Sequence, residues 1–280
     1  MPDNILFNLA FLSQIVLISA WLPRVLYKRA RHILETYPAD QYPRLYPKGA
    51  ASYERNLMHF VYMNVAIFLV GMFFWVVFNT DATNSDYQGV SWAIFMLQTV
   101  PFFLVELFMF RTWKLMRECD KRTTRKAALR SRGLGDVMSP LQVGLVVGVF
   151  AVFCLFIAYI DQFGFPWFGG YLNVLVIGLG NTFLAALVAW NFYGRKKDPY
   201  MEEKDRINRT RLMARQFVLV SIAVTVYAMV IITLQAFDLY QYKQLAMALY
   251  AQLLAIGFYF TFYQDHNVNF EVYRDEPSTT

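Results

Sequence analysis

The chain has 280 residues and a formal net charge of +6, and 57% of its residues are hydrophobic while only 16% are charged. Because soluble domains carry about 25% charged residues, this composition excludes an ordinary soluble protein. The charges fall into short blocks between apolar runs of roughly 20 residues, the length that a helix needs to cross about 30 Å of hydrocarbon. The sequence therefore predicts an all-α, polytopic membrane protein.

Seven apolar windows follow one another along the chain and predict a seven-helix bundle. We expect a transmembrane domain over residues 1–263, with spans at 5–22, 57–78, 90–110, 141–160, 171–193, 217–236 and 244–263. The polar remainder, 264–280, is predicted to be a tail with a mobile end. The first window lacks a preceding basic segment and is too long for a signal-peptide core, so we expect it to be retained as a span.

Basic residues predict which side of the membrane each loop faces. Of the 26 Lys and Arg residues, all but Lys243 follow the first, third and fifth spans or lie in the tail. Cytoplasmic loops are enriched in Lys and Arg, so the N-terminus is predicted to be outside and the tail cytoplasmic, in a bacterial inner membrane. We expect this basic face to attract anionic lipids, at about 1 kcal/mol per well-placed side chain, and not nucleic acid.

The connector after the first span has two distinct parts. Residues 24–37 place apolar and basic side chains on different helical faces, which predicts a helix that lies along the membrane surface. A Tyr-Pro pair then begins at each of Tyr37, Tyr42 and Tyr46. Each proline biases the preceding tyrosine toward extended or turn geometry, so we expect a stiff connector that returns the chain to the second span. A docking strip for a partner protein is the alternative.

The third span holds the residues with the clearest functional potential. Ser91, Gln98, Thr99 and Glu106 recur at spacings of seven or eight and are predicted to form one polar seam facing the bundle. Pro101 has no N–H for the carbonyl four residues before it, so we expect a kink and an additional acceptor beside the seam. A carboxylate at mid-membrane costs about 2.5–3.5 kcal/mol, which makes Glu106 a functional candidate. The alternatives are a structural carboxyl group and a proton, cation or ligand site.

Thr99, Pro101 and Glu106 also carry a local resemblance to the microbial rhodopsins. In that family the third of seven helices has a threonine, a proline and an acidic proton donor at this spacing. The resemblance would imply a retinal Schiff base on a lysine of the seventh helix, but the window 244–263 contains no lysine. The sequence therefore does not predict a retinal protein. The seven-helix sugar transporters match in helix number alone, because the chain has neither their Pro-Gln pair nor an internal repeat.

The fourth and fifth spans are predicted to pack closely through small residues. Gly144 and Gly148 lie one turn apart in the fourth span, and Gly178 and Ala185 belong to a similar stripe in the fifth. Small residues let helix backbones approach in lipid, so we expect these two spans to meet there, with homodimerisation through the same faces as the alternative. Neutral polar residues are expected to hydrogen-bond between helices: Asn8, Gln14, Asn64, Gln98, Thr99, Asn173, Asn181, Ser221, Thr225 and Gln252.

The sequence contains no constellation typical of catalysis or of cofactor binding. Neither a His-x-x-His nor a Glu-x-x-His pair occurs, and Cys119 and Cys154 have no disulfide or metal-type spacing, so we expect no metal and no cofactor. We predict a non-catalytic membrane component that contacts a membrane-protein partner or a second copy of itself. The first alternative is a channel or transporter for a small solute, proton or ion along the seam at Glu106. The second is a lipid-modifying enzyme, for which His59 and Glu106 are the available pair.

Overall fold

The computed structural model describes residues 2–80, 88–120, 133, 135, 137–193, 198–264 and 268–274, and these residues form helices and no strands. Seven of the described helical segments are long and apolar enough to cross a membrane. The prediction of an all-α protein with seven candidate spans is thus confirmed. The side of the membrane on which each terminus lies stays a prediction.

The helices contain the predicted windows and extend beyond them mainly at basic residues. In chain order they are α1 (Pro2–Val16), the π-helical turn η1 (Leu17–Trp21), α2 (Leu22–Thr36), η2 (Pro43–Leu45), α3 (Ala50–Thr80), α4 (Gln88–Cys119), α5 (Pro140–Asp161), α6 (Leu172–Tyr193), α7 (Glu203–Ala236), η4 (Tyr240–Tyr242), α8 (Lys243–Gln264) and η5 (Phe270–Tyr273). Hydropathy locates only the apolar part of a helix, whereas backbone hydrogen bonds continue into polar sequence. The starts of α3 and α7 and the end of α4 are therefore longer than predicted.

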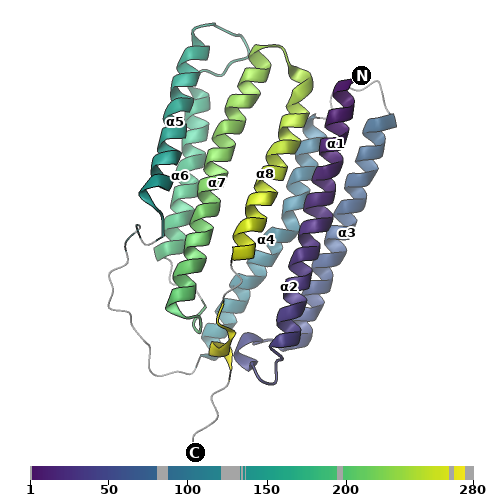
Figure 1. Cartoon of the computed structure of the whole chain (residues 1–280), viewed down its shortest axis with the longest axis vertical. Coiled ribbons are helices and arrows are strands. Elements are labelled where there is room, and N and C mark those ends of the chain that lie inside the picture. The colour runs from purple at the N-terminus through teal and green to yellow at the C-terminus, as the bar shows by residue number, and fades with distance from the viewer. Residues whose placement is uncertain are drawn as a thin grey trace, which may run out of the picture. The chain divides into compact units, whose positions relative to one another are not determined.

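The first span is one continuous helical column made of α1, η1 and α2 (Figure 1). In η1 the N–H of Leu22 donates to the carbonyl of Leu17, a bond across five residues that widens the turn. Pro23 explains this turn, because it has no N–H for the carbonyl of Ser19 and its ring would clash with that carbonyl in a regular helix. α2 follows without a turn. Residues 24–36 are thus helical as predicted for a helix that runs out of the membrane, and its position along the membrane surface stays a prediction.

The described contacts divide the chain into two compact units. Unit 1 comprises Met1–Phe11, Arg132–Gly194 and Ile207–His266, and unit 2 comprises Leu12–Ser131, Arg195–Arg206 and Asn267–Thr280. Unit 1 thus contains α5, α6, α8 and most of α7, and unit 2 contains α2, α3, α4 and the short segments η1, η2 and η5.

In unit 2, α3 contacts α2, η1 and α4. A glycine also lets α3 approach the end of α1: a Cβ atom added at Gly71 would lie 3.1–3.3 Å from side-chain carbons of Ile15. The interior of this unit is apolar and includes Ile15, Ile18, Leu22, Phe60, Ile67, Ile94 and Phe95, all buried. Close backbone contact and apolar packing hold the helices of the unit together.

In unit 1, α5 contacts α6, and their aromatic and branched side chains form a common core. Phe153 and Ile157 of α5 are fully buried there, against Ile232 of α7. α7 also packs against α8: the ring of Tyr227 in α7 stacks on the ring of Tyr250 in α8, with their centroids 4.6 Å apart. The helices of this unit therefore pack in pairs through interdigitated side chains.

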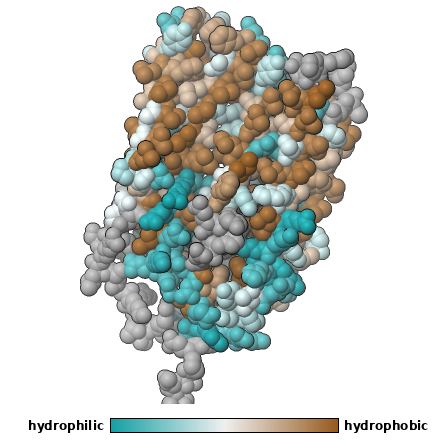
Figure 2. Space-filling view, in the orientation of Figure 1, coloured by the Kyte–Doolittle hydropathy of each residue, from teal (hydrophilic) through white to brown (hydrophobic). Residues whose placement is uncertain are grey.

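Large apolar side chains cover much of the outer surface of the helices. Examples are Leu69, Phe103, Leu155 and Trp190, which are 61%, 72%, 72% and 76% exposed. Such exposure would favour aggregation in water but is favourable in hydrocarbon. Over the first helical column, Figure 2 shows hydrophobic residues along α1 and hydrophilic residues along α2. This distribution agrees with an integral membrane protein.

Candidate functional site

The polar interior of unit 2 is a three-residue hydrogen-bond network centred on Gln98 of α4. The Nε2 of Gln14 donates to the Oε1 of Gln98 at 2.9 Å, and the Nε2 of Gln98 donates to the Oγ of Ser19 at 3.0 Å. All three side chains are buried, with exposed fractions of 1%, 1% and 4% for Gln14, Gln98 and Ser19. This Gln98 network joins α1, η1 and α4, and its amides and hydroxyl carry no charge.

The network depends on the π-helical turn at η1. A hydroxyl in a regular helix often bonds back to a carbonyl of its own preceding turn. Ser19 instead lies in the widened turn that precedes Pro23, and its Oγ accepts from Gln98. Sequence analysis did not identify Ser19, although Pro23, four residues later, is the signal that marks the irregular turn.

The predicted seam in α4 separates into two groups. Ser91, Gln98 and Pro101 are buried, so these positions do face the interior of unit 2. Thr99 instead donates to the carbonyl of Met96 in its own helix at 2.7 Å. Glu106 is half-buried and makes no hydrogen bond or ion pair with any other described residue. The structure therefore brings Gln98 together with Gln14 and Ser19, and it does not join Thr99 or Glu106 to them.

Glu106 is distant from the Gln98 network along α4. Eight residues separate Gln98 from Glu106, which is about 12 Å of helix. The glutamine amides of the network do not titrate, so a proton path would need further groups between them. His59, the residue paired with Glu106 in the lipid-enzyme hypothesis, is exposed on α3, and no hydrogen bond or ion pair among the described residues joins the two.

Unit 1 has its own polar network, between α6 and α7. The Oγ of Ser221 donates to the Oδ1 of Asn181 at 2.8 Å, and the Nδ2 of Asn181 donates to the Oγ1 of Thr225 at 3.3 Å. Thr225 completes its bonding by donating to the carbonyl of Ser221 at 2.8 Å. Ser221 and Thr225 are buried. The predicted role of these three residues in joining helices agrees with this geometry.

The remaining predicted polar contacts differ in kind. Gln252 of α8 donates to the carbonyl of Ala10 of α1 at 2.8 Å, so it joins two helices. Asn64 donates to the carbonyl of Phe60 at 2.7 Å within α3, and Asn173 donates to the carbonyl of Gly170 at 3.1 Å. These two amides satisfy nearby backbone and do not bridge helices.

The small residues predicted to pack α5 against α6 occupy different environments. Gly178 lies in the α5–α6 contact, because a Cβ atom there would be 3.2 Å from the ring of Phe150. Gly144 and Gly148 are exposed, with open space where a Cβ atom would lie, and Ala185 is also exposed. Within the described chain, α5 therefore meets α6 through Phe150 and Gly178 and not through its two glycines.

An aromatic cluster in unit 2 surrounds the end of α4. Its buried members are Tyr42, Trp113, Met116, Tyr200 and Tyr273. These residues come from the connector after α2, the end of α4, the segment before α7 and the segment η5. We call this group the tyrosine cap. The cap joins parts of the chain that are more than 200 residues apart, and it lies at the basic ends of its helices.

A buried carboxylate organises the cap. Asp198 is only 4% exposed, and its Oδ2 accepts from the hydroxyl of Tyr273 at 2.6 Å while its Oδ1 accepts from the backbone N–H of Tyr200 at 2.9 Å. Arg206 donates to the carbonyls of Asp198 and Met201 at 3.2 and 3.3 Å. These bonds offset the cost of removing a carboxylate from water.

Further hydrogen bonds attach η5 to the cap. The hydroxyl of Tyr42 donates to Glu271 at 2.8 Å, and Asn269 donates from its backbone and side chain to Asp205 and Glu202 at 2.9 and 2.8 Å. The hydrogen bond to Glu271 and the burial of the ring raise the pKa of Tyr42. Burial also raises the pKa of Tyr46, in the same connector, to about 12. Both tyrosines are therefore neutral at physiological pH, and Tyr42 acts as a donor.

Sequence analysis recognised the Tyr-Pro connector but not its contacts. The segment was predicted to be stiff, and the structure packs Tyr42 of this connector against the end of α4 and against η5. Residues 268–274 were assigned to a polar tail, yet they form η5, whose Tyr273 is 2% exposed. The expected mobile end of the tail, 275–280, lies outside the described residues.

The described residues contain no group of three or more His, Cys, Asp or Glu side chains able to hold a metal ion. No family model matches the chain, and neither the comparison with curated proteins nor that with solved structures finds a match. The local contacts and charges of the two units are therefore the basis for assigning a function.

Proposed function

We propose that the protein is a non-catalytic component of a membrane assembly and that it contacts its partner through the tyrosine cap. The observation that carries this proposal is the order at that end of unit 2, where four segments distant in sequence are joined by a buried carboxylate and an aromatic core. Ordering these segments costs conformational entropy. A surface held in a fixed shape for contact with a partner would account for that cost.

The two hydrogen-bond networks inside the spans support the same function. The Gln98 network and the Asn181 network are neutral, and each joins helices of its own unit. Bonds of this kind stabilise helix association by about 0.6 kcal/mol each. Stabilisation of helix association therefore explains why these polar side chains are present inside the spans, and no bound substrate is needed to explain them.

Site-specific photo-crosslinking in native membranes tests the proposal. A photoreactive amino acid is placed at Lys48, exposed in the connector beside the cap, and the control is placed at Tyr240, which is 47% exposed in the loop before α8. We expect one polypeptide to crosslink at position 48 and not at position 240, with a lower yield when Tyr273→Phe loosens the cap. The same products at both positions, or none, would contradict the proposal.

A channel for a proton or small cation is the second candidate, and one observation favours it. Glu106 is a half-buried carboxylate in a candidate span without a partner among the described residues, an unusual state for an ionisable group in a membrane. In proteoliposomes, Glu106→Gln should abolish flux if the channel exists, whereas Thr99→Val should not, because Thr99 bonds only within its own helix. Equal flux in Glu106→Gln and the unmodified protein would exclude Glu106 from conduction.

A further inference from the structure

Two contacting helical columns of unit 2 expose the same order of side chains. From the apolar part toward the basic part, the first column presents Trp21, Arg24 and Lys28, and α3 presents Tyr62, His59 and Arg55, and all six are exposed. In each helix the second and third residues lie three and seven positions from the aromatic residue, which keeps them on one face. The cations are thus about 4.5 to 10.5 Å beyond the ring along the axis.

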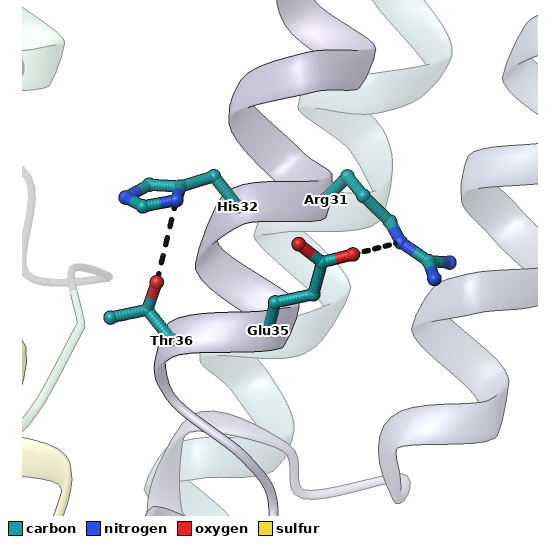
Figure 3. Close-up of polar contacts among 4 residues, drawn as sticks. All are labelled: Arg31, His32, Glu35 and Thr36. Atoms are coloured by element: carbon teal, nitrogen blue, oxygen red, sulfur yellow. Dashed lines mark hydrogen bonds and ion pairs between the residues drawn. The ribbon is translucent and has the colours of Figure 1, made fainter.

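Three of these basic residues have no partner among the residues that the structure describes. Arg24, Lys28 and Arg55 make no hydrogen bond or ion pair with another described residue. Arg31, the next basic residue on this face of α2, does: its Nε donates to Glu35 at 2.7 Å, and Figure 3 shows the two side chains together. On this face of the first column, the two unpaired cations, Arg24 and Lys28, are therefore nearer to the apolar part than the paired Arg31.

The apolar side of both faces matches the hydrocarbon of a bilayer. Leu69 and Phe73 continue the exposed face of α3 beyond Tyr62 and are 61% and 63% exposed, and Val16, five residues before Trp21, is 44% exposed. Trp and Tyr concentrate where hydrocarbon meets headgroups, so Trp21 and Tyr62 fix the depth of the two helices. The neighbouring cations then lie at the level of lipid phosphate.

We propose that this aromatic-basic border, defined as Trp21, Arg24 and Lys28 with Tyr62, His59 and Arg55, binds anionic phospholipid headgroups. Arg24, Lys28 and Arg55 contact the phosphate and any acidic headgroup, and the two aromatic rings lie at the ester level of the lipid. Charge complementarity and continuity with the apolar surface select a lipid as the occupant. The site is separate from the tyrosine cap and does not depend on a protein partner.

Native mass spectrometry of the purified protein, released from mixed phosphatidylglycerol and phosphatidylcholine nanodiscs, measures this binding. The test variant combines Arg24→Gln, Lys28→Gln and Arg55→Gln. The control combines Lys48→Gln, Lys114→Gln and Lys204→Gln, three exposed cations of the same unit, and removes the same charge. Each cation at a membrane surface changes affinity by about fivefold, so we expect the test variant to lose phosphatidylglycerol preference by on the order of a hundredfold.

A conservative variant, Arg24→Lys with Lys28→Arg and Arg55→Lys, keeps the experiment decisive should the neutral variant fail to fold. This variant should retain the preference, and the preference should fall as salt is raised, because exposed charges are screened. The proposal is overturned if the neutral variant keeps its preference for phosphatidylglycerol or if the conservative variant loses it. It is also overturned if the control loses as much preference as the test variant. The last result would show attraction by total charge and not by the border.

Discussion

At the scale of single residues, Gln98 joins three segments of unit 2, because its side chain bonds to both Gln14 and Ser19. Gln98→Leu removes both hydrogen bonds and leaves the buried amide of Gln14 without its acceptor. We expect a loss of about 1–3 kcal/mol in stability, seen as a lower Tm in detergent. Thr99→Val, the adjacent control, should have little effect, and a similar Tm for both variants would contradict this role of Gln98.

Gly71 is the residue that sets the distance between α3 and α1. A methyl group there would be 3.1–3.3 Å from Ile15, so this fully buried side chain would have to shift within a packed interior. Gly71→Ala should therefore cost about 1–3 kcal/mol, although alanine favours helix formation. Gly148→Ala in α5 has open space around it and should be neutral or stabilising in the same melting experiment. Equal Tm values would show that α3 tolerates the displacement.

The residues of the polar interior could be predicted only in part. Gln14, Gln98, Asn181, Ser221 and Thr225 were expected to bridge helices, because an unpaired polar side chain in hydrocarbon is costly. Their pairing requires the relative rotation of the helices, which periodicity in one sequence does not give. Thr99 was assigned to the same seam as Gln98, but it is the next residue along the helix and therefore points in a different direction around the axis. Its hydroxyl bonds to the backbone of its own helix.

At the scale of elements, the tyrosine cap fastens η5 to the start of α7. Tyr273→Phe removes the donor that Asp198 accepts at 2.6 Å and leaves a buried carboxylate with one bond fewer. We expect faster hydrogen exchange in residues 198–206 and a loss of about 1–3 kcal/mol for opening of this segment. Tyr171→Phe, at a tyrosine that is 63% exposed, is the matched control. Unchanged exchange in Tyr273→Phe would mean that aromatic packing alone holds η5.

The connector that leads from the cap to α3 should loosen in alkaline solution. Burial raises the pKa of Tyr46 to about 12, above its value of about 10 in the unfolded chain. The folded state binds the phenol proton more tightly than the unfolded chain does. The free energy of unfolding that this contributes is therefore fully present below pH about 10 and is lost as the pH rises toward 12. Comparison of tyrosinate absorbance between the protein and Tyr46→Phe should show a missing step near the higher value. A missing step near pH 10 would indicate that Tyr46 is accessible to water.

The positions of the long helices were predictable, whereas the cap was not. Apolar windows place seven helices because backbone groups in hydrocarbon must bond within their own helix. The cap is made of short segments whose hydrogen bonds are with residues far away in sequence, as Tyr42 and Glu271 show. The three Tyr-Pro pairs indicated a fixed backbone, but no local pattern identifies Asp198 or Tyr273 as the partners.

At the scale of the whole molecule, the predicted topology rests on the distribution of charge along the sequence. Of the 26 Lys and Arg residues, 25 belong to segments predicted to be cytoplasmic. A helix makes the same internal hydrogen bonds whichever way it crosses the membrane. The orientation is therefore a consequence of insertion and not of packing within the units. It has to be measured in a membrane.

Cys119 provides that measurement, because it is exposed at the end of α4, whereas Cys154 is partly buried within α5. In a Cys154→Ser background, a maleimide that does not cross membranes should label Cys119 in inverted vesicles and not in intact cells, since the end of α4 is predicted to be cytoplasmic. Tyr240→Cys, introduced with Cys119→Ser, should give the opposite pattern. Labelling of Cys119 from outside intact cells would reverse the topology and place the tyrosine cap on the external face, where a partner would have to be sought instead.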